Sequence, residues 1–460
     1  MRKHIRTLGI IGAALIVGGL VYRFGFFSRA RPNVILIVLD TFRADRLAAY
    51  GATQGLTPFL DRWAAQSTVY EHAYAASSWT VPSVATLLLA QYPSEHQLIR
   101  MTSVLPDSKR TLTEVLRDHG FHTGGFSGNM QISRKTGFGQ GFDTFKLLVS
   151  PNLVKGDAQQ LNQAALQWLA QRSPADPPFF LYLQYMDTHS PYREHAGLTP
   201  PRAPTLHTSD SDLNKRVTDG SFAAAFGDHH PWHFDPAEMQ RLLDLYDGEV
   251  RYLDRRVGEF LSNLAQRGVL RHTLVIITAD HGEQFGEHEI LSHGVSLYES
   301  AIHIPLIVRL PDQSSAAQFT VPVELAGLAP ALLERFEIPR PTEFHIPPMP
   351  LGDSTAHTRA STPIFSELLK SHPQDFRLHR YALIDGSRKV LVTETGDWVY
   401  EDLATDPQEN HPLTAAPFAE QLRQSLAHVT STLSAPSDPQ QDKPIEDHTR
   451  ERLHSLGYAN

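Results

Sequence analysis

The sequence predicts an α/β fold: a large mixed, mostly parallel sheet flanked by helices, with a smaller C-terminal antiparallel sheet. Continuous aliphatic and aromatic runs, typical of parallel strands buried on both faces, lie at 33–39, 178–186 and 273–279. Helical patterns separate these runs. Short runs divided by Asp-Gly-Ser and Thr-Gly-Asp turns predict the antiparallel sheet, at 381–385, 389–392 and 398–400.

The chain has 460 residues, of which 41% are hydrophobic, so it can form one large domain with a smaller appendage. We expect three parts: an N-terminal membrane anchor or signal segment (1–30), a main domain (31–340) and a C-terminal subdomain (341–460). The net charge is −9, and residues 1–31 contain basic residues but no acid. The rest of the chain is therefore strongly acidic, which argues against a nucleic-acid partner.

The N-terminal segment contains an apolar run, 8–22, followed after Arg23 by four more apolar or small residues. It approaches the roughly 20 residues that cross a bilayer. We expect a single-pass membrane anchor, with the main domain on the periplasmic or extracellular side. A weak small-x-small sequence at 28–30 leaves a cleaved signal peptide, and hence a secreted protein, as the alternative. The chain has no cysteine, which excludes disulfides and a lipoprotein anchor.

The first strand, 33–39, ends at Asp40, at the sheet edge where open α/β folds bind ligands. The pattern becomes helical from Val81, and Pro82 fits a first helical turn. Thr80 is therefore expected at or just before a helix N-terminus, among unpaired N–H groups that bind tetrahedral oxyanions. Taken alone, Thr80 is most simply a helix cap.

Other elements follow from the same patterns. A helix is expected at 111–119, ended by Gly120, and a long amphipathic helix at 236–267, ended by Gly268. The stretch 193–236 lacks periodicity and predicts a long loop or insertion. The remaining expected elements are a helix starting at Pro58, strands at 121–126 and 304–309, and a helix at 417–433.

Two core strands end in acids, Asp40 and Asp280, and His281 follows the second. Hard carboxylate oxygens with one imidazole suit Mn²⁺, Zn²⁺ or Mg²⁺, whereas Ca²⁺ prefers more oxygen ligands. Either Asp alone could be a turn former or cap. The two acids and His281 occur together with a helix N-terminus that can bind an anion, and this combination favours a metal site. Three further polar residues in the same loop fit either a solvated turn or a second metal site: Glu283, Glu287 and His288.

Several motifs occur in a fixed order: 31–45, 79–83, 91–96, 187–192, 278–283 and 402–409. Together they resemble the sulfatase-like branch of the alkaline phosphatase superfamily, over nearly the whole chain from Arg31. The resemblance implies that residues 31–340 are a catalytic domain. It places Thr80 at the nucleophile, and the divalent metal ligands at Asp40, Asp280 and His281. It also implies that His189 and His293 contact the transferred group or protonate the leaving group, and that Asn129 approaches the site.

The chain departs from this family at two places. Sulfatases carry Cys-x-Pro-x-Arg, whose cysteine becomes formylglycine, but this chain has Thr80 and Val84 at those positions, so no formylglycine can form. Relatives with Thr or Ser there tend to transfer phosphoryl groups. Thr41 stands where many sulfatases have another Asp, which favours a metal smaller than Ca²⁺.

The expected function is that of a metal-dependent sulfatase-family hydrolase or transferase, acting on phosphate or sulfate esters through a covalent Thr80 intermediate. The substrate would be a small-molecule, lipid or glycan ester. One alternative is a sulfuric ester hydrolase that uses unmodified Thr80. Another, from a different class, is a non-catalytic protein that keeps the sulfatase fold and binds carbohydrate or lipid.

Overall fold

The computed structural model describes residues 31–149, 155–173, 176–225, 233–313, 315–352, 362–371, 377–393 and 396–433. The expected anchor or signal segment, 1–30, lies outside these residues. Among the residues described, no helix has the length and apolar character needed to cross a membrane. The division into three parts stays a prediction.

The core of the molecule is an eight-stranded sheet. In spatial order its strands are β12 (Ala317–Phe319), β2 (Thr68–Tyr70), β11 (Leu306–Arg309), β7 (Thr273–Ala279), β1 (Asn33–Leu39), β6 (Phe179–Tyr185), β4 (His122–Ser127) and β5 (Thr144–Leu147). β11 runs antiparallel to both of its neighbours, and the other pairs are parallel. The predicted large, mixed and mostly parallel sheet is confirmed.

The register of the central strands fixes where the site lies. Leu39, the last residue of β1, pairs with Tyr185 of β6 and Ala279 of β7. The three strands therefore end together, and the residues that follow them emerge at one edge of the sheet. These strands are buried from end to end, apart from the first residue of β1, which explains their continuous apolar sequences.

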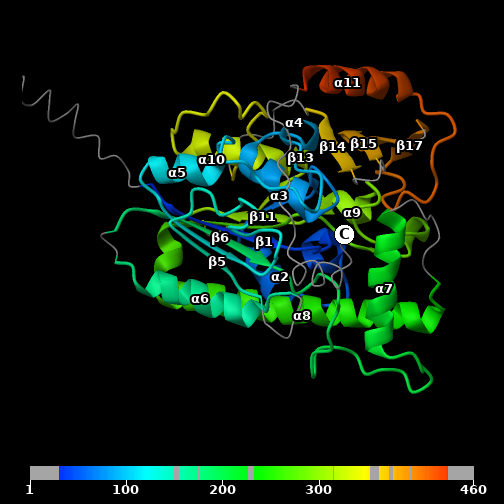
Figure 1. Cartoon of the computed structure of the whole chain (residues 1–460), viewed down its shortest axis with the longest axis horizontal. Coiled ribbons are helices and arrows are strands. Elements are labelled where there is room, and N and C mark those ends of the chain that lie inside the picture. Colours follow the sequence, from blue (N-terminus) through cyan, green and yellow to red (C-terminus); the bar gives the residue numbers. More distant parts are fainter. Residues whose placement is uncertain are drawn as a thin grey trace, which may run out of the picture.

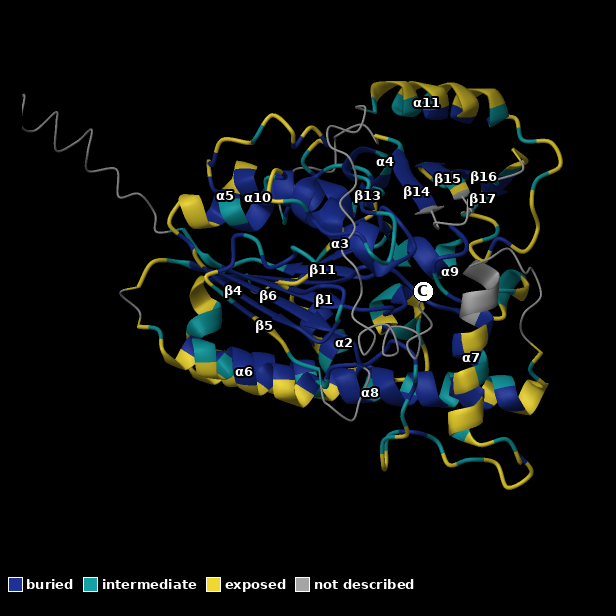
Figure 2. Cartoon of the chain, in the orientation of Figure 1, coloured by how far each residue is buried: buried dark blue, intermediate teal, exposed yellow. Residues whose placement is uncertain are grey.

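Helices cover both faces of this sheet (Figure 1). One face carries α6 (Ala158–Ala170) and α8 (Pro236–Gln266), and the other carries α3 (Thr80–Leu89), α5 (Leu112–Asp118) and α10 (Leu328–Arg335). Figure 2 shows exposed residues on the outer side of α6 and α8 and buried residues toward the sheet. Asp235 caps α8 through hydrogen bonds from two backbone N–H groups, and Gly268 follows its end with φ 73°.

The C-terminal part forms a four-stranded antiparallel sheet, as predicted. Its strands are β14 (Ile364–Ser371), β15 (Arg377–Asp385), β16 (Arg388–Val392) and β17 (Trp398–Asp402). The sequence had predicted only the last three, and β14 adds to them at the edge. Helix α11 (Ala419–Thr432) packs on this sheet (Figure 1).

Short elements complete the described fold. They are α2 (Pro58–Ala64), β3 (Ala73–Tyr74), α4 (Pro93–His96), β8 (Gln284–Phe285), β9 (Leu291–Ser292), α9 (Glu299–Ile302), β10 (His303–Ile304) and β13 (Val323–Glu324).

The expectation of a loop throughout 193–236 was wrong in part, because α7 (Asp210–Ala225) lies within it. Among its described side chains (210–220), Leu213 and Val217 bury aliphatic groups one turn apart. Polar contacts also hold the helix, including a 2.7 Å ion pair between Arg241 of α8 and Asp210. So sparse an apolar pattern gives little sequence signal.

Candidate active site

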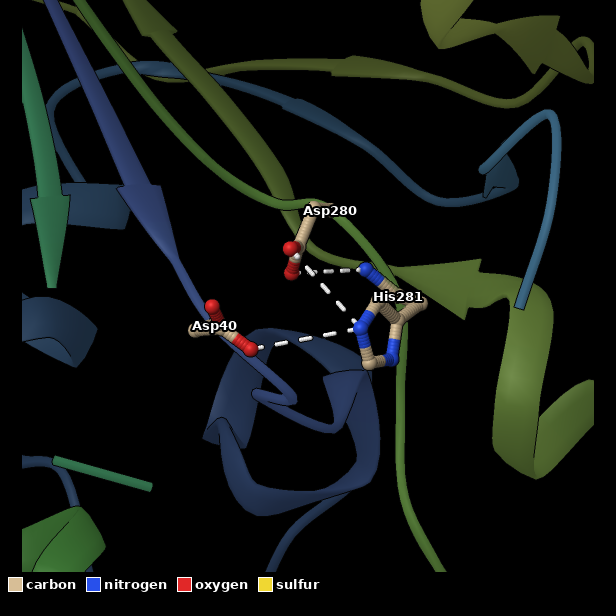
Figure 3. Close-up of side chains that lie close together, drawn as sticks. All are labelled: Asp40, Asp280 and His281. Atoms are coloured by element: carbon tan, nitrogen blue, oxygen red, sulfur yellow. Dashed lines mark hydrogen bonds and ion pairs between the residues drawn. The ribbon is translucent and has the colours of Figure 1, made fainter. Parts of the chain in front are cut away.

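Asp40, Asp280 and His281 form a buried group, here called the acid–histidine cluster (Figure 3). Asp40 directly follows β1, and Asp280 and His281 follow β7. One potential ligand atom from each residue lies within 4.8 Å of the others. His281 Nε2 is 3.9 Å from Asp40 Oδ1 and 3.7 Å from Asp280 Oδ2. The aligned strand ends thus bring Asp40 together with Asp280 and His281, which lie 240 and 241 residues further along the chain.

The hydrogen bonds of this cluster leave an open acceptor. Asp40 Oδ2 accepts from Asn129 Nδ2 at 2.7 Å and from Gln184 Nε2 at 3.1 Å. Asp40 Oδ1 is buried and accepts no hydrogen bond from the described residues. Gln184 also donates to Asp280 Oδ2 at 3.3 Å. This oxygen is available to a cation, and together with Asp280 and His281 it makes a donor set that fits a divalent metal ion.

The protonation of the cluster supports the same reading. Burial raises the pKa of Asp40 to about 7, and the nearby Asp280 carboxylate adds to the shift. Burial likewise raises the pKa of Asp280 to about 7, against the hydrogen bonds that it accepts. His281 Nδ1 lies 2.9 Å from the Gly282 carbonyl oxygen. We infer that the proton sits on Nδ1, which leaves Nε2 facing the carboxylates as a ligand atom.

Thr41 links the cluster to α8 through a strained backbone. Its φ is 58°, a conformation that is uncommon for a β-branched residue. Its N–H lies 3.3 Å from Asp280 Oδ1, and its carbonyl accepts from the Tyr246 hydroxyl at 2.9 Å. These two bonds hold the left-handed turn in place directly after Asp40.

Thr80 is the first residue of α3, and Trp79 occupies the N-cap position. The Thr80 side chain is fully buried, and its Oγ1 lies 3.3 Å from His281 Nε2. The hydroxyl is thus directed at the acid–histidine cluster, so a simple capping role does not describe it. It stands at the positive end of a helix that is buried throughout.

Two further histidines complete the arrangement. The ring of His293 lies 4.6 Å from that of His281 and 4.9 Å, edge-on, from that of His189, measured between centroids. His189 Nδ1 is 2.6 Å from the Ser190 carbonyl oxygen. Burial and the neighbouring His293 lower the pKa of His189, so this ring is neutral in the free protein. All six predicted site residues lie together, and their catalytic and metal-binding roles stay predictions.

Glu283 has a role that the sequence did not reveal. It is fully buried, its Oε1 lies 2.9 Å from His293 Nδ1, and its Oε2 accepts from the Tyr192 hydroxyl at 2.9 Å. Burial raises its pKa to about 8. Glu287 instead pairs with Arg43 at 2.6 Å, and His288 stacks on Tyr298. In the described chain these three residues form no second metal cluster, so that alternative is not supported.

Two other residues near the site escaped sequence analysis. Gln184 joins Asp40 to Asp280, and the only available signal was one polar residue inside the apolar strand β6. Lys155 lies behind His189, just before α6, where nothing in the sequence pattern marks it. Asn129, expected to approach the site, does so through its bond to Asp40.

Comparison with known proteins places the chain in a family. Residues 32–338 match the sulfatase family model. Arylsulfatase K of Danio rerio is 25% identical over 348 residues, covering 68% of this chain and 66% of that protein, which is just under two thirds. A phosphonate monoester hydrolase from Silicibacter pomeroyi shares the fold with a TM-score of 0.69 and 19% identity, covering 91% of this chain and 100% of that chain. A 2-O GAG sulfatase gives 0.67 and 17%, covering 87% and 91% respectively. Because the family model spans more than half of the sequence, the chain belongs to the sulfatase family, within the alkaline phosphatase superfamily.

Proposed function

We propose that this protein is a metal-dependent hydrolase or transferase that acts on phosphate esters through a covalent intermediate on Thr80. One observation carries the proposal: a buried hydroxyl at a helix N-terminus lies 3.3 Å from His281 Nε2, beside two buried carboxylates. A hydroxyl in that position can attack a tetrahedral centre whose oxygens the helix N-terminus binds.

Asp40, Asp280 and His281 would hold the divalent cation, since Asp40 Oδ1 accepts no hydrogen bond from the described residues. A cation bound there supplies charge neutralisation of a substrate oxygen and lowers the pKa of a nearby hydroxyl. Two carboxylates and one imidazole favour Mn²⁺, Zn²⁺ or Mg²⁺ over Ca²⁺.

The residues of the chain account for the transfer itself. The hydroxyl proton of Thr80 passes to solvent, and Thr80 Oγ forms a bond to phosphorus while the bond from phosphorus to the leaving oxygen breaks. The negative charge of a bound ester favours the protonated form of the adjacent imidazoles, so His189 or His293 can give a proton to that oxygen. Backbone N–H groups at the start of α3 stabilise the phosphoryl oxygens. Water or an acceptor hydroxyl then releases the group from Thr80.

Sulfate esters are the second candidate substrate. They are favoured by the relatives, which include an arylsulfatase and a 2-O GAG sulfatase and suggest a sulfated glycan or another sulfate ester. Against them stands the nucleophile: the chain has no cysteine to become formylglycine, and Val84 replaces the assisting arginine. A non-catalytic binding role would not require the Thr80 hydroxyl to lie so close to His281.

We also propose that the N-terminal segment tethers the enzyme to a membrane, with the catalytic domain on the periplasmic or extracellular side. This rests on the apolar run at 8–22 and its basic flanks.

The test uses the full chain loaded with Mn²⁺ or Zn²⁺. After incubation with bis(4-nitrophenyl) phosphate, intact mass spectrometry should show an adduct that peptide mapping locates on Thr80. Thr80→Ala should abolish the adduct, while the matched control Thr80→Ser should retain it. Nitrophenyl sulfate, assayed in parallel, separates the two ester classes. Absence of an adduct, together with absence of metal-dependent turnover of either ester, would overturn the proposal in favour of a binding role.

A further inference from the structure

A buried lysine lies directly behind the turn that carries His189. Lys155 is 1% exposed, and its Nζ donates to the main-chain oxygens of Asp187 and His189. Its third acceptor is Glu249 Oε1, at 3.0 Å. An ammonium group has three N–H donors, so these acceptors use all of them. Two of the three contacts are to the backbone on either side of Thr188.

Glu249 of α8 forms hydrogen bonds at the C-terminal end of the same segment, with Arg193 and His195. Its Oε1 also accepts from the Arg193 backbone N–H at 2.9 Å, and its Oε2 lies 2.6 Å from His195 Nε2. Burial acts to raise the pKa of Glu249, but the Lys155 ammonium and the His195 hydrogen bond lower it to about 2. The carboxylate is therefore ionised at neutral pH, and one side chain anchors both Lys155 and residues 193–195.

This segment determines where the His189 ring stands. The Thr188 hydroxyl donates to the Asp40 carbonyl at 2.6 Å, which fixes the turn to the end of β1. His189 Nδ1 is bound to the next carbonyl, and the ring meets His293 edge-on. These contacts restrict rotation of the His189 ring about its side-chain bonds. A shift of the 187–193 backbone would therefore move the ring away from the site.

We propose that Lys155 and Glu249 are a positioning pair that fixes residues 187–193 and thereby aligns His189 with the leaving oxygen. Neither residue needs to touch the substrate. The proposal rests on the function proposed above, since it assigns His189 to the leaving-group side of a phosphoryl transfer. It predicts that loss of the pair impairs the reaction most where the leaving oxygen most needs a proton.

The experiment compares two phosphodiesters with different leaving groups. Nitrophenolate leaves without protonation, whereas phenolate needs it, so bis(4-nitrophenyl) phosphate and diphenyl phosphate report on proton donation. For Lys155→Met, we expect kcat on diphenyl phosphate to fall roughly 10²-fold, the usual contribution of a positioned proton donor. The loss on the nitrophenyl ester should stay below about 10-fold, within the effect of slight misplacement.

A second buried lysine provides the matched control. Lys389 of β16 is 0% exposed and pairs with Glu299 of α9 and with Glu409, and none of these three is among the six predicted site residues. Lys389→Met removes the same charge from a similar environment. Its kcat per folded molecule should remain that of the wild type on both esters.

Two further variants keep the test decisive. Glu249→Gln preserves shape and should show the same selective loss, even if Lys155→Met does not fold. The double variant Lys155→Met/Glu249→Gln removes both charges of the pair, and its selective loss on diphenyl phosphate should be no larger than that of either single variant, because the two residues act as one unit. Equal losses on both esters, or no loss in either single variant, would overturn the positioning role. Failure of the wild type on both esters would instead contradict the proposed function.

Discussion

Two buried charge clusters in this protein have similar components and different consequences. The acid–histidine cluster contains two carboxylates and an imidazole at the end of β1 and β7. The second, here called the lysine cluster, consists of Lys389, Glu299 and Glu409 and joins β16 to the start of α9. Lys389 Nζ lies 2.8 Å from Glu299 Oε1 and 2.7 Å from Glu409 Oε1.

The difference lies in the source of the positive charge. In the lysine cluster, the chain itself places an ammonium between two carboxylates. Lys389 lowers the pKa of Glu299 despite burial, whereas burial still raises the pKa of Glu409 to about 7. In the described part of the chain, Asp40 and Asp280 form ion pairs with His281 alone, and burial raises the pKa of each to about 7. Burial of charge alone therefore does not mark a functional site. The acid–histidine cluster differs from the lysine cluster in lacking a lysine or arginine of its own.

The largest expected effect comes from breaking the acid–histidine cluster. Asp280→Asn removes a charged ligand while keeping the shape, so metal binding should weaken and turnover should fall by at least roughly 10²- to 10³-fold. Glu299→Gln makes the same change in the lysine cluster and should leave the turnover of the folded protein unchanged. Metal content and kcat are measured for both. Equal losses of activity in the two variants would contradict the comparison.

The lysine cluster should matter for stability instead. Lys389→Met leaves two buried carboxylates without their cation, and breaking a buried pair in this way costs about 3–5 kcal/mol. Thermal unfolding followed by circular dichroism should show a lower midpoint for this variant. An unchanged midpoint would mean that Lys389 contributes no net stabilisation where it lies.

The smallest expected effect is that of a change of pH. It tests the acid–histidine cluster through its affinity for a metal ion and needs no mutation. Asp40 and Asp280 hold protons up to about pH 7 in the metal-free protein, and a metal ion must displace them. Affinity for Mn²⁺ should therefore rise from pH 5 to about pH 7 and then level off, as titration calorimetry at constant ionic strength can measure. An affinity independent of pH over this range would contradict the raised pKa values.

The same shift has a defined sign for stability. Between about pH 4 and pH 7 an unfolded chain would have lost these protons, while the folded metal-free protein keeps them. The folded state then binds more protons, so the contribution of this pair to stability decreases as pH rises through that window. Metal should offset the loss, and the rise in unfolding temperature on adding Mn²⁺ should be larger at pH 8 than at pH 5.

The sequence predicted the parts of the site that stand at the ends of regular elements. Asp40 and Asp280 follow apolar runs, and Thr80 precedes a helical pattern, so local periodicity located all three. The proximity of Asp40 and Asp280 follows from the parallel register of β1 and β7, which the predicted parallel sheet implies. The large sheet and the antiparallel C-terminal sheet were predictable for the same reason.

What the sequence could not predict depends on contacts between distant segments. Lys155 and Glu249 are 94 residues apart, and neither side chain departs from what an exposed helix or loop would carry. Glu283 looked like part of a polar turn until the fold placed Tyr192 and His293 against it. Helix α7 was missed because its apolar pattern is sparse, and ion pairs such as that of Asp210 with Arg241 contribute to its contact with α8.

The anchoring of Arg31 has a geometrical consequence. Arg31 donates to the carbonyl oxygens of Phe336 and His119, each at 3.1 Å, at the edge of the sheet where β1 begins. The seven residues of β1 then carry the chain to Asp40, over roughly 23 Å at the usual rise per residue. If residues 1–30 tether the protein to a bilayer, the central sheet acts as a spacer, and Thr80 works on molecules that arrive from the side opposite the tether.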